Sequence, residues 1–132
     1  MTTRHQVRGS YLLDSNILVW LDSGSSRLND QIRHDLRYAE HRFLSAATAW
    51  ELSLKQAAGK LTLGASISSM LAAFRLEELP VLIRHGERAA TLPFHHSDPF
   101  DRIIVAQALE DSLILVTADH RLTDYNVPIL LI

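Results

Sequence analysis

The run Leu113-Ile114-Leu115-Val116-Thr117 constrains the fold of this chain more than any other stretch. It is apolar up to Thr117 and has the length of a β-strand, and such unbroken runs are typical of strands buried on both faces within a parallel sheet. Parallel strands need long crossover connections, which are usually helices. The run therefore predicts an α/β fold with a central parallel β-sheet flanked by helices.

The rest of the chain alternates between short strands and helices, as this fold requires. Further strands are predicted at residues 10–14, 42–45, 79–82 and 127–131, the third as a weak edge strand because it contains Pro80. Helices are predicted after Asp14, from Asn29, over about 46–58, from Ser66, over about 84–92 and from Asp98 to about residue 112. The alternation implies right-handed crossovers and helices on both faces of the sheet.

Length and composition indicate one domain. The chain has 132 residues, 47% of them apolar, which is enough for a core of its own. Residues 1–9 are predicted to form a flexible N-terminal tail, and residues 10–132 the domain. The absence of cysteine excludes a disulfide scaffold, thiolate zinc sites and a cysteine nucleophile. No run resembles a signal peptide or membrane span, so a cytoplasmic protein without a membrane partner is expected.

The formal net charge of −2 argues against a domain that holds nucleic acid by bulk electrostatics alone, because such domains are usually strongly basic. It does not exclude a nuclease. Among the 13 basic residues only Lys55 and Lys60 are lysines. The planar fork of arginine suits phosphate and carboxylate groups, but a genomic composition bias explains the excess of arginine equally well.

The pair Asp98-Pro99 marks the start of a strongly apolar helix. An oxygen-bearing N-cap followed by proline at the first helical position is typical of a helix start, and this explains Asp98. Asp101 lies in the first turn beside core residues, where the cap is already supplied. Helix capping therefore does not explain the acid at position 101.

Arg102 is the residue next to Asp101. Its guanidinium could contact a phosphate group, or it could form an ion pair at the protein surface.

Three acids are predicted to meet at one edge of the sheet. Asp14 and Asp119 follow two predicted strands, and Asp101 begins the helix that leads into the second of them. Ligands of parallel sheets bind beyond the carboxyl ends of the strands. Clustered carboxylates raise one another's pKa, and a divalent cation resolves this conflict. An all-oxygen set without cysteine favours Mg²⁺ or Mn²⁺. His95 and His96 could add a ligand, although histidines in a polar loop are more often solvated.

Glu51 has two competing explanations. It borders the apolar stripe predicted for the helix over 46–58, which consists of Ala47, Trp50, Leu54 and Ala57 or Ala58. It joins the three acids if the N-terminal half of this helix packs at the same edge of the sheet. Alternatively, it forms an exposed i,i+4 pair with Lys55. The spacing alone leaves both explanations open.

Four motifs in this order resemble the PIN domain, specifically that of the VapC toxins of bacterial toxin–antitoxin pairs. They are Leu12-Leu13-Asp14-Ser15-Asn16, Trp50-Glu51-Leu52, His96-Ser97-Asp98-Pro99-Phe100-Asp101-Arg102 with Ala106-Gln107-Ala108, and Val116-Thr117-Ala118-Asp119. The resemblance covers about residues 10–132. It implies a single PIN-like domain with site acids Asp14, Glu51, Asp101 and Asp119, supported by Ser15, Asn16, Asp98 and Thr117.

The resemblance also implies a function. The expected activity is that of an endoribonuclease toxin that hydrolyses RNA and is neutralised by a cognate antitoxin protein. Asp14, Asp101 and Asp119 would hold Mg²⁺ or Mn²⁺, with Glu51 bound directly or through water, for attack of a water on the phosphodiester. A homodimer is expected as well. Apolar residues of two predicted helices offer a surface for it, unless they merely cover the sheet: Ile32, Leu36, Ile67, Met70, Leu71 and Phe74.

Three alternatives fit less well. A receiver-like Mg²⁺-binding signalling domain needs an acidic pair after its first strand, and here Ser15 follows Asp14. A phosphatase with an Asp-x-Asp nucleophile needs a second acid where this chain has Asn16. The third alternative is a PIN-fold protein that binds RNA or a partner without cleaving RNA. The intact set of acids argues against it, and a cleavage assay would distinguish it from a nuclease.

Overall fold

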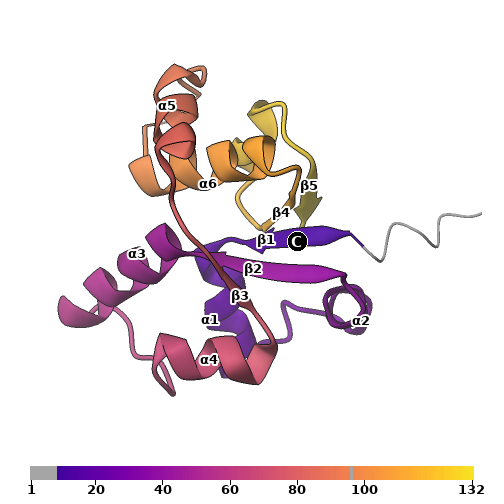
Figure 1. Cartoon of the computed structure of the whole chain (residues 1–132). Helices are drawn as coiled ribbons and strands as arrows, with labels where there is room; N and C mark the ends of the chain where they lie inside the picture. Colours follow the sequence, from indigo (N-terminus) through magenta and orange to yellow (C-terminus); the bar gives the residue numbers. More distant parts are fainter. Residues whose placement is uncertain (1–8, 96) are drawn as a thin grey trace, which may run out of the picture.

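Five short parallel strands form the centre of the molecule (Figure 1). The computed structural model describes residues 9–95 and 97–132, so the predicted tail, apart from Gly9, lies outside the described residues. The strand order is β3-β2-β1-β4-β5, and each neighbouring pair is parallel. The strands are β1 Ser10–Leu13, β2 His41–Ser45, β3 Glu77–Leu79, β4 Ile114–Thr117 and β5 Ile129–Leu131. The predicted parallel α/β fold is confirmed.

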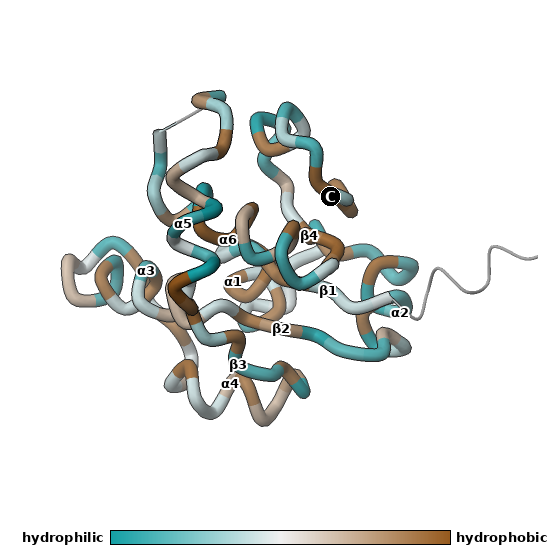
Figure 2. Tube along the Cα trace, turned by 45° about the horizontal axis from the view of Figure 1, so that its top comes forward, coloured by the Kyte–Doolittle hydropathy of each residue, from teal (hydrophilic) through white to brown (hydrophobic). Residues whose placement is uncertain are grey.

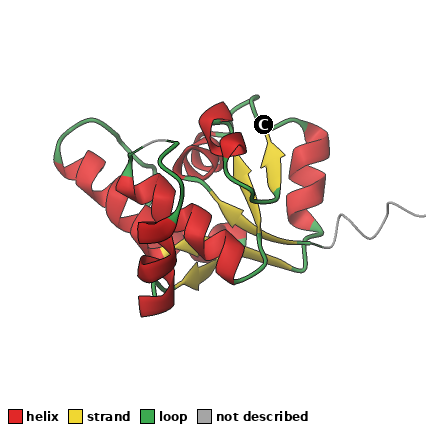
Figure 3. Cartoon of the chain, turned by 90° about the horizontal axis from the view of Figure 1, so that it is seen from above, coloured by secondary structure: helices red, strands yellow, loops and turns green. Residues whose placement is uncertain are grey.

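Helices cover both faces of this sheet (Figure 3). Side chains alternate along a strand, so Tyr11 and Leu13 of β1 pack on one face and Leu12 on the other. The face of Tyr11 and Leu13 carries α1 Ser15–Ser23, α2 Asp30–Arg37, α3 Ala46–Ala57 and α4 Ile67–Phe74. The opposite face carries α5 Ile83–Thr91, α6 Pro99–Glu110 and the 3₁₀ helix η2 His120–Asp124. The central strand β1 is therefore buried on both faces.

Capping residues begin the helices where the sequence predicts. The Asn29 side chain accepts a hydrogen bond from Ile32 N at 2.9 Å at the start of α2, and Ser66 Oγ accepts one from Ser69 N at 3.1 Å at the start of α4. Gly59, just beyond α3, has φ 73°, a conformation that glycine adopts without strain. These local signals require no knowledge of the tertiary structure.

The predicted stripe of α3 is wrong. The helix buries Thr48 and Leu52, whereas Trp50 is 62% and Leu54 is 46% exposed (relative area). Apolar residues lie on several sides of this helix, so periodicity alone does not decide which side faces the sheet. Packing through Thr48 and Leu52 leaves Glu51 between the buried and exposed sides of α3, with its side chain 13% exposed.

Of the apolar residues of α2 and α4, Leu36 and Met70 are buried, so they offer no surface to a partner. The others, Ile32, Ile67, Leu71 and Phe74, are partly buried against the core and keep part of their surface exposed. One further expectation is corrected by the structure. The edge strand β3 ends at Leu79, before Pro80, so it lies earlier than the predicted residues 79–82.

Hydropathy changes along the strands toward the centre of the fold. In β2, the first residues are hydrophilic and Phe43 and Leu44 are hydrophobic, which Figure 2 shows along the trace. The burial of β2 follows the same order, from exposed at His41 to buried at Leu44 and Ser45. Over the residues described here, none of the helices has the length and apolar character needed to span a lipid bilayer.

Candidate active site

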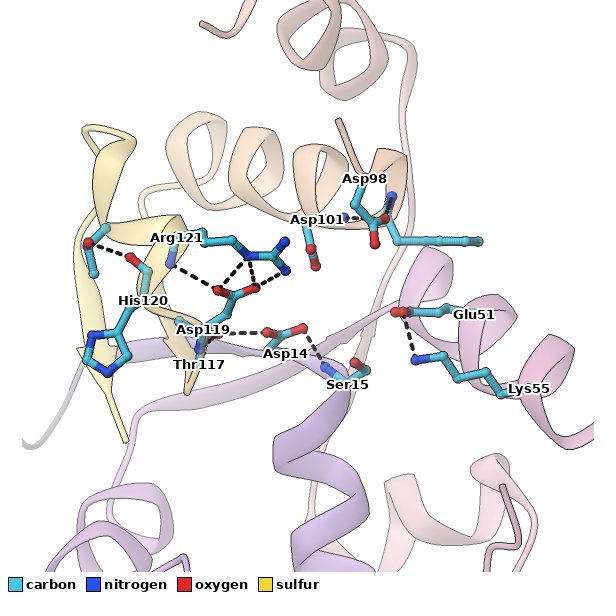
Figure 4. A network of polar contacts seen from close by, with 12 residues as sticks. Asp14, Ser15, Glu51, Lys55, Asp98, Asp101, Thr117, Asp119, His120 and Arg121 are labelled. Carbon is cyan, nitrogen blue, oxygen red and sulfur yellow. Dashed lines mark hydrogen bonds and ion pairs between the residues drawn. The ribbon is translucent and has the colours of Figure 1, made fainter. Parts of the chain in front are cut away.

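The acids at the ends of β1 and β4 lie side by side because these strands are neighbours. Leu13 pairs with Val116 in the register, and Asp14 N donates to Val116 O at 2.9 Å. Asp14 is the next residue after β1, and Asp119 follows two residues after Thr117, the last residue of β4. The predicted meeting of Asp14 and Asp119 at the carboxyl edge of the sheet agrees with this geometry (Figure 4).

Asp14 is held by its immediate surroundings. The Thr117 hydroxyl donates to Asp14 Oδ2 at 2.7 Å, and Ser15 N donates to Asp14 Oδ1 at 2.7 Å. The residue is only 5% exposed. Burial raises the pKa of Asp14 above its ordinary value, and these hydrogen bonds only partly counteract that rise. Two of the predicted supporting residues, Ser15 and Thr117, thus contact an acid directly.

The first turn of α6 brings two more acids to this edge. Asp98 caps the helix as predicted, since its Oδ1 accepts from Phe100 N at 2.9 Å and from Asp101 N at 3.4 Å. Asp101 lies one turn further, partly buried. Burial, and then the charges of Asp14, Asp98, Glu51 and Asp119 in that order, raise its pKa to about 7. The pKa of Asp101 is therefore raised by its burial and by the negative charges of the four other acids.

Glu51 combines parts of both explanations, because it pairs with Lys55 but its side chain is only 13% exposed. Lys55 Nζ lies 3.3 Å from Glu51 Oε2, so the i,i+4 pair exists. Burial nevertheless raises the pKa of Glu51, Lys55 lowers it, and the charges of Asp14 and Asp98 raise it further. In Figure 4 its carboxylate points away from α3 toward the other acids, and the Lys55 ammonium lies below it, on the side away from α6. Glu51 is thus a member of the acidic cluster with a basic neighbour.

Asp119 carries a basic partner that the sequence reading missed. Arg121 donates from Nε to both carboxylate oxygens, at 3.1 and 3.2 Å, and from Nη2 to Oδ2 at 2.7 Å. Asp119 Oδ1 also caps η2 by accepting from Arg121 N at 2.9 Å. The available signal was a basic residue two positions after a strand-end acid, which is weak on its own.

The structure also gives the surroundings of Arg102, Asn16 and His95, and only those of Arg102 differ from the prediction. Arg102 is buried, and its guanidinium donates to the carbonyls of Ala89 at 2.8 Å, Leu92 at 2.9 Å and Pro93 at 3.0 Å. It is neither a phosphate contact nor half of a surface ion pair, because its donors hold the chain between α5 and α6. Asn16 is exposed, and within the described residues its side chain makes no hydrogen bond. His95 is exposed, which agrees with the expectation of a solvated histidine, and its ring lies against that of Tyr125 with centroids 4.9 Å apart. His96 lies outside the described residues.

The chemistry of the donors fits a hard divalent cation. Carboxylate oxygens are the preferred ligands of Mg²⁺ and Mn²⁺, and the raised pKa of Asp101 reflects a concentration of negative charge that a cation would offset. In the described part of the chain, no group of three or more acids and histidines is already arranged to hold a metal ion. Instead, Arg121 donates hydrogen bonds to both carboxylate oxygens of Asp119, and Thr117 donates one to Asp14 Oδ2.

Comparison with known proteins agrees with this fold and motif order. A sequence model of the PIN domain matches residues 11–128. The chain belongs to the PIN domain family. The predicted resemblance is thereby confirmed, and the alternatives of a receiver-like domain and an Asp-x-Asp phosphatase are excluded. A curated relative, Ribonuclease VapC22 from Mycobacterium tuberculosis, is 28% identical over 120 residues, which are 89% of this chain and 92% of that protein.

Solved structures show the same PIN fold. A toxin–antitoxin complex from Klebsiella pneumoniae contains a chain that matches this one with a TM-score of 0.68 and 20% identity, over 92% of this chain and 96% of that chain. VapBC2 from Rickettsia felis, bound to a DNA fragment from its promoter, matches with a TM-score of 0.67 and 16% identity, over 91% and 96%. At these identities the likeness establishes the fold.

Proposed function

We propose that this PIN domain is a VapC-type toxin, an endoribonuclease that hydrolyses RNA phosphodiester bonds with a divalent metal ion. The observation that carries the proposal is the convergence of Asp14, Asp101, Asp119 and Glu51 from four separate elements on one edge of the sheet. The raised pKa of Asp101 supports their closeness. The curated relative named as a ribonuclease supports the substrate class.

The residues have distinct roles in this proposal. Asp14, Asp101 and Asp119 would hold the ion, and Glu51 would contact it directly or through a water. When bound, Mg²⁺ or Mn²⁺ would supply positive charge to activate the attacking water and to stabilise the departing oxygen. Thr117 and Ser15 fix the orientation of Asp14 through their hydrogen bonds. Asp98 caps α6 and so places Asp101 in the first turn.

We infer that a cognate antitoxin is the protein partner, since the solved relatives include toxin–antitoxin complexes. A cavity of about 520 Å³ between α1, α2 and the end of α4 suits part of such a partner. Apolar side chains such as Leu21 and Phe74 line it, together with the arginines Arg33, Arg37, Arg42 and Arg75. Among the described residues, none of these arginines has a carboxylate partner. The cavity therefore favours a segment with apolar and acidic side chains.

A homodimer in the cytoplasm remains part of the proposal. Of the residues first expected to supply the interface, Leu36 and Met70 are buried, and Ile32, Ile67, Leu71 and Phe74 keep only part of their surface exposed. Large apolar side chains that stay exposed include Trp50 and Leu54 on α3 and Val81, Leu82 and Ile83 before and at the start of α5. Exposed apolar groups of this kind commonly mark an interface. Light scattering at micromolar concentration tests the dimer without affecting the nuclease proposal.

Sequencing of RNA ends after brief expression tests the nuclease function. New 5′ ends should appear with the wild-type chain and be absent with Asp14→Asn, which retains the size of the side chain but removes its charge. The same purified proteins should cleave RNA in Mg²⁺ or Mn²⁺ and lose this activity in EDTA. Equal RNA ends from both chains would leave the remaining alternative, a PIN-fold module that binds RNA or a partner without cleavage.

A further inference from the structure

Two basic side chains lie against the acidic cluster, and in Figure 4 the guanidinium of Arg121 lies between Asp119 and Asp101. Lys55 lies beside Glu51 with a single contact of 3.3 Å. Arg121 lies beside Asp119 and uses two of its nitrogens on both carboxylate oxygens, between 2.7 and 3.2 Å. A planar guanidinium that covers both oxygens leaves fewer free directions for a cation than an ammonium at a single oxygen does.

Arg121 is well placed to leave this position. Its side chain is 65% exposed, whereas that of Asp119 is 23% exposed. Solvent-exposed ion pairs contribute little to stability, so their separation costs little. Among the described residues, Asp119 is the hydrogen-bond partner of the Arg121 guanidinium, and the charges of Asp101 and Asp98 attract it as well. The pair is therefore a local arrangement and not part of the packing that holds η2 on the sheet.

A cavity beside the cluster offers Arg121 a second position. The space, about 440 Å³, is lined by Ser97, Asp98, Pro99, Phe100 and Arg121. It adjoins the first turn of α6, where Asp101 lies. A phosphate group in this cavity would present oxygens to the same planar fork that now faces a carboxylate, because arginine binds both groups in a bidentate manner.

We propose that Arg121 forms an ion pair with Asp119 when no metal ion is bound, and that this pair separates when Asp119 ligates the metal ion. The guanidinium of Arg121 then contacts a phosphate of the RNA in the adjoining cavity. This inference rests on the proposed nuclease function and adds a substrate-binding residue to it. It also gives the acidic cluster an internal cation that competes with the metal. A change at Arg121 should therefore affect metal binding and RNA binding in opposite directions.

Calorimetric titration with Mn²⁺ tests the first half of the proposal. Arg121→Gln removes the ion pair, and it should bind Mn²⁺ about two- to fivefold more tightly than the wild type, the effect expected for an exposed pair. Arg121→Lys retains the charge without the fork, and it should also bind Mn²⁺ more tightly. Arg88→Gln breaks a comparable pair with Glu110, 2.6 Å long and outside the site, and serves as the matched control.

Binding of a fluorescent phosphorothioate RNA oligonucleotide, which resists cleavage, tests the second half. In Mn²⁺, Arg121→Gln should bind it several-fold more weakly than the wild type, and the salt dependence should fall by about 0.7, the value for one phosphate contact on a single strand. In EDTA, where Arg121 is held by Asp119, the substitution should have a much smaller effect. Arg88→Gln should match the wild type in both conditions.

The outcomes separate this inference from the proposed function. If the wild type binds Mn²⁺ and cleaves RNA, but Arg121→Gln leaves Mn²⁺ affinity unchanged or weaker, the competition is refuted. If Arg121→Lys has the Mn²⁺ affinity of the wild type while Arg121→Gln binds Mn²⁺ more tightly, the change in net charge explains the effect. The two-oxygen ion pair of the guanidinium would then not be the competitor, and the inference would be refuted. If Arg121→Gln binds RNA as the wild type does in Mn²⁺, the phosphate contact is refuted. A wild type that binds no Mn²⁺ would overturn the inference and the metal mechanism together.

Discussion

Thr117 donates a hydrogen bond to Asp14 Oδ2 at 2.7 Å, although the two residues are 103 positions apart in the sequence. The same hydroxyl oxygen accepts a hydrogen bond from Asp119 N at 3.0 Å. One fully buried side chain thus links the acids that follow β1 and β4. The geometry of the acidic edge depends on this hydroxyl as well as on the carboxylates themselves.

Replacement of Thr117 by valine tests this link. Thr117→Val keeps the shape but removes the donor and the acceptor, so the free energy of unfolding should fall by about 1–3 kcal/mol. Cleavage should fall by about 10–100-fold, as expected for support of a metal ligand. Urea unfolding and an RNA cleavage assay measure the two effects. Thr117→Ser retains the hydroxyl and should stay close to the wild type. Full activity of the valine variant would contradict a role in orienting Asp14.

The raised pKa of Asp101 predicts the pH dependence of stability without metal. The pKa of this carboxyl is about 7 in the folded state and has its ordinary value of 3.8 in the unfolded chain. Between these pH values the folded state therefore binds more protons than the unfolded state does. The free energy of unfolding should therefore fall as pH rises from about 4 to about 7. Since the group is only partly buried and solvent screens its charge, we expect a loss of about 1–2 kcal/mol.

Chemical unfolding at a series of pH values in EDTA measures this dependence. Asp14 and Glu51 shift in the same direction and add to it. Asp101→Asn cannot ionise and should remove a large part of the slope, whereas Asp124→Asn, an exposed acid at the end of η2, should keep it. Stability that rises across this pH range in the wild type would show that the acids are not mutually repulsive.

Glu51 and Lys55 give a matched pair of substitutions on one helix. Glu51→Gln should reduce cleavage by about 10–100-fold if the carboxylate contacts the metal directly or through water. Lys55→Ala should be almost silent, because the lysine is itself 47% exposed and an i,i+4 pair contributes only about 0.3–0.5 kcal/mol. Cleavage rates at saturating Mn²⁺ measure both. Activity that survives Glu51→Gln and EDTA would exclude the metal mechanism.

Substitutions of Asp98, the N-cap of α6, and of Asp101, in its first turn, should have different effects. The first should change stability and the second should change catalysis. Asp98→Ala removes the N-cap and should lower the free energy of unfolding by about 0.5–2 kcal/mol. Asp101→Asn should retain the fold and abolish cleavage. Thermal unfolding and a cleavage assay distinguish them. A stable, inactive Asp98→Ala beside an active Asp101→Asn would mean that the two roles are reversed.

The sequence predicted those parts of the site that depend on topology and local capping. Acids after parallel strands meet at one edge, so the positions of Asp14 and Asp119 followed from the strand assignment alone. The cap formed by Asp98 followed from its position before Pro99. Each of these inferences needs only neighbouring residues and the general rules for parallel sheets.

The parts that were missed depend on side-chain packing. Helix α3 has apolar residues on several sides, and only contact with the sheet selects Thr48 and Leu52 over Trp50 and Leu54. Arg102 looked like a surface residue because most of its hydrogen-bond partners are backbone carbonyls, which have no sequence signature. The pairing of Arg121 with Asp119 depends on the rotamers of two partly exposed side chains, which no motif encodes.

The strand order has a consequence for how this protein matures on the ribosome. Strand β1 emerges early, but its neighbour on one side is β4, so Asp14 cannot reach Thr117 until most of the chain has been synthesised. A nascent chain that stops before β4 contains Asp14, Glu51 and Asp101 but lacks Asp119 and the hydroxyl that orients Asp14. Such non-local pairing is a slow step in folding. Translation thus delays the assembly of the acidic edge until the polypeptide is nearly complete.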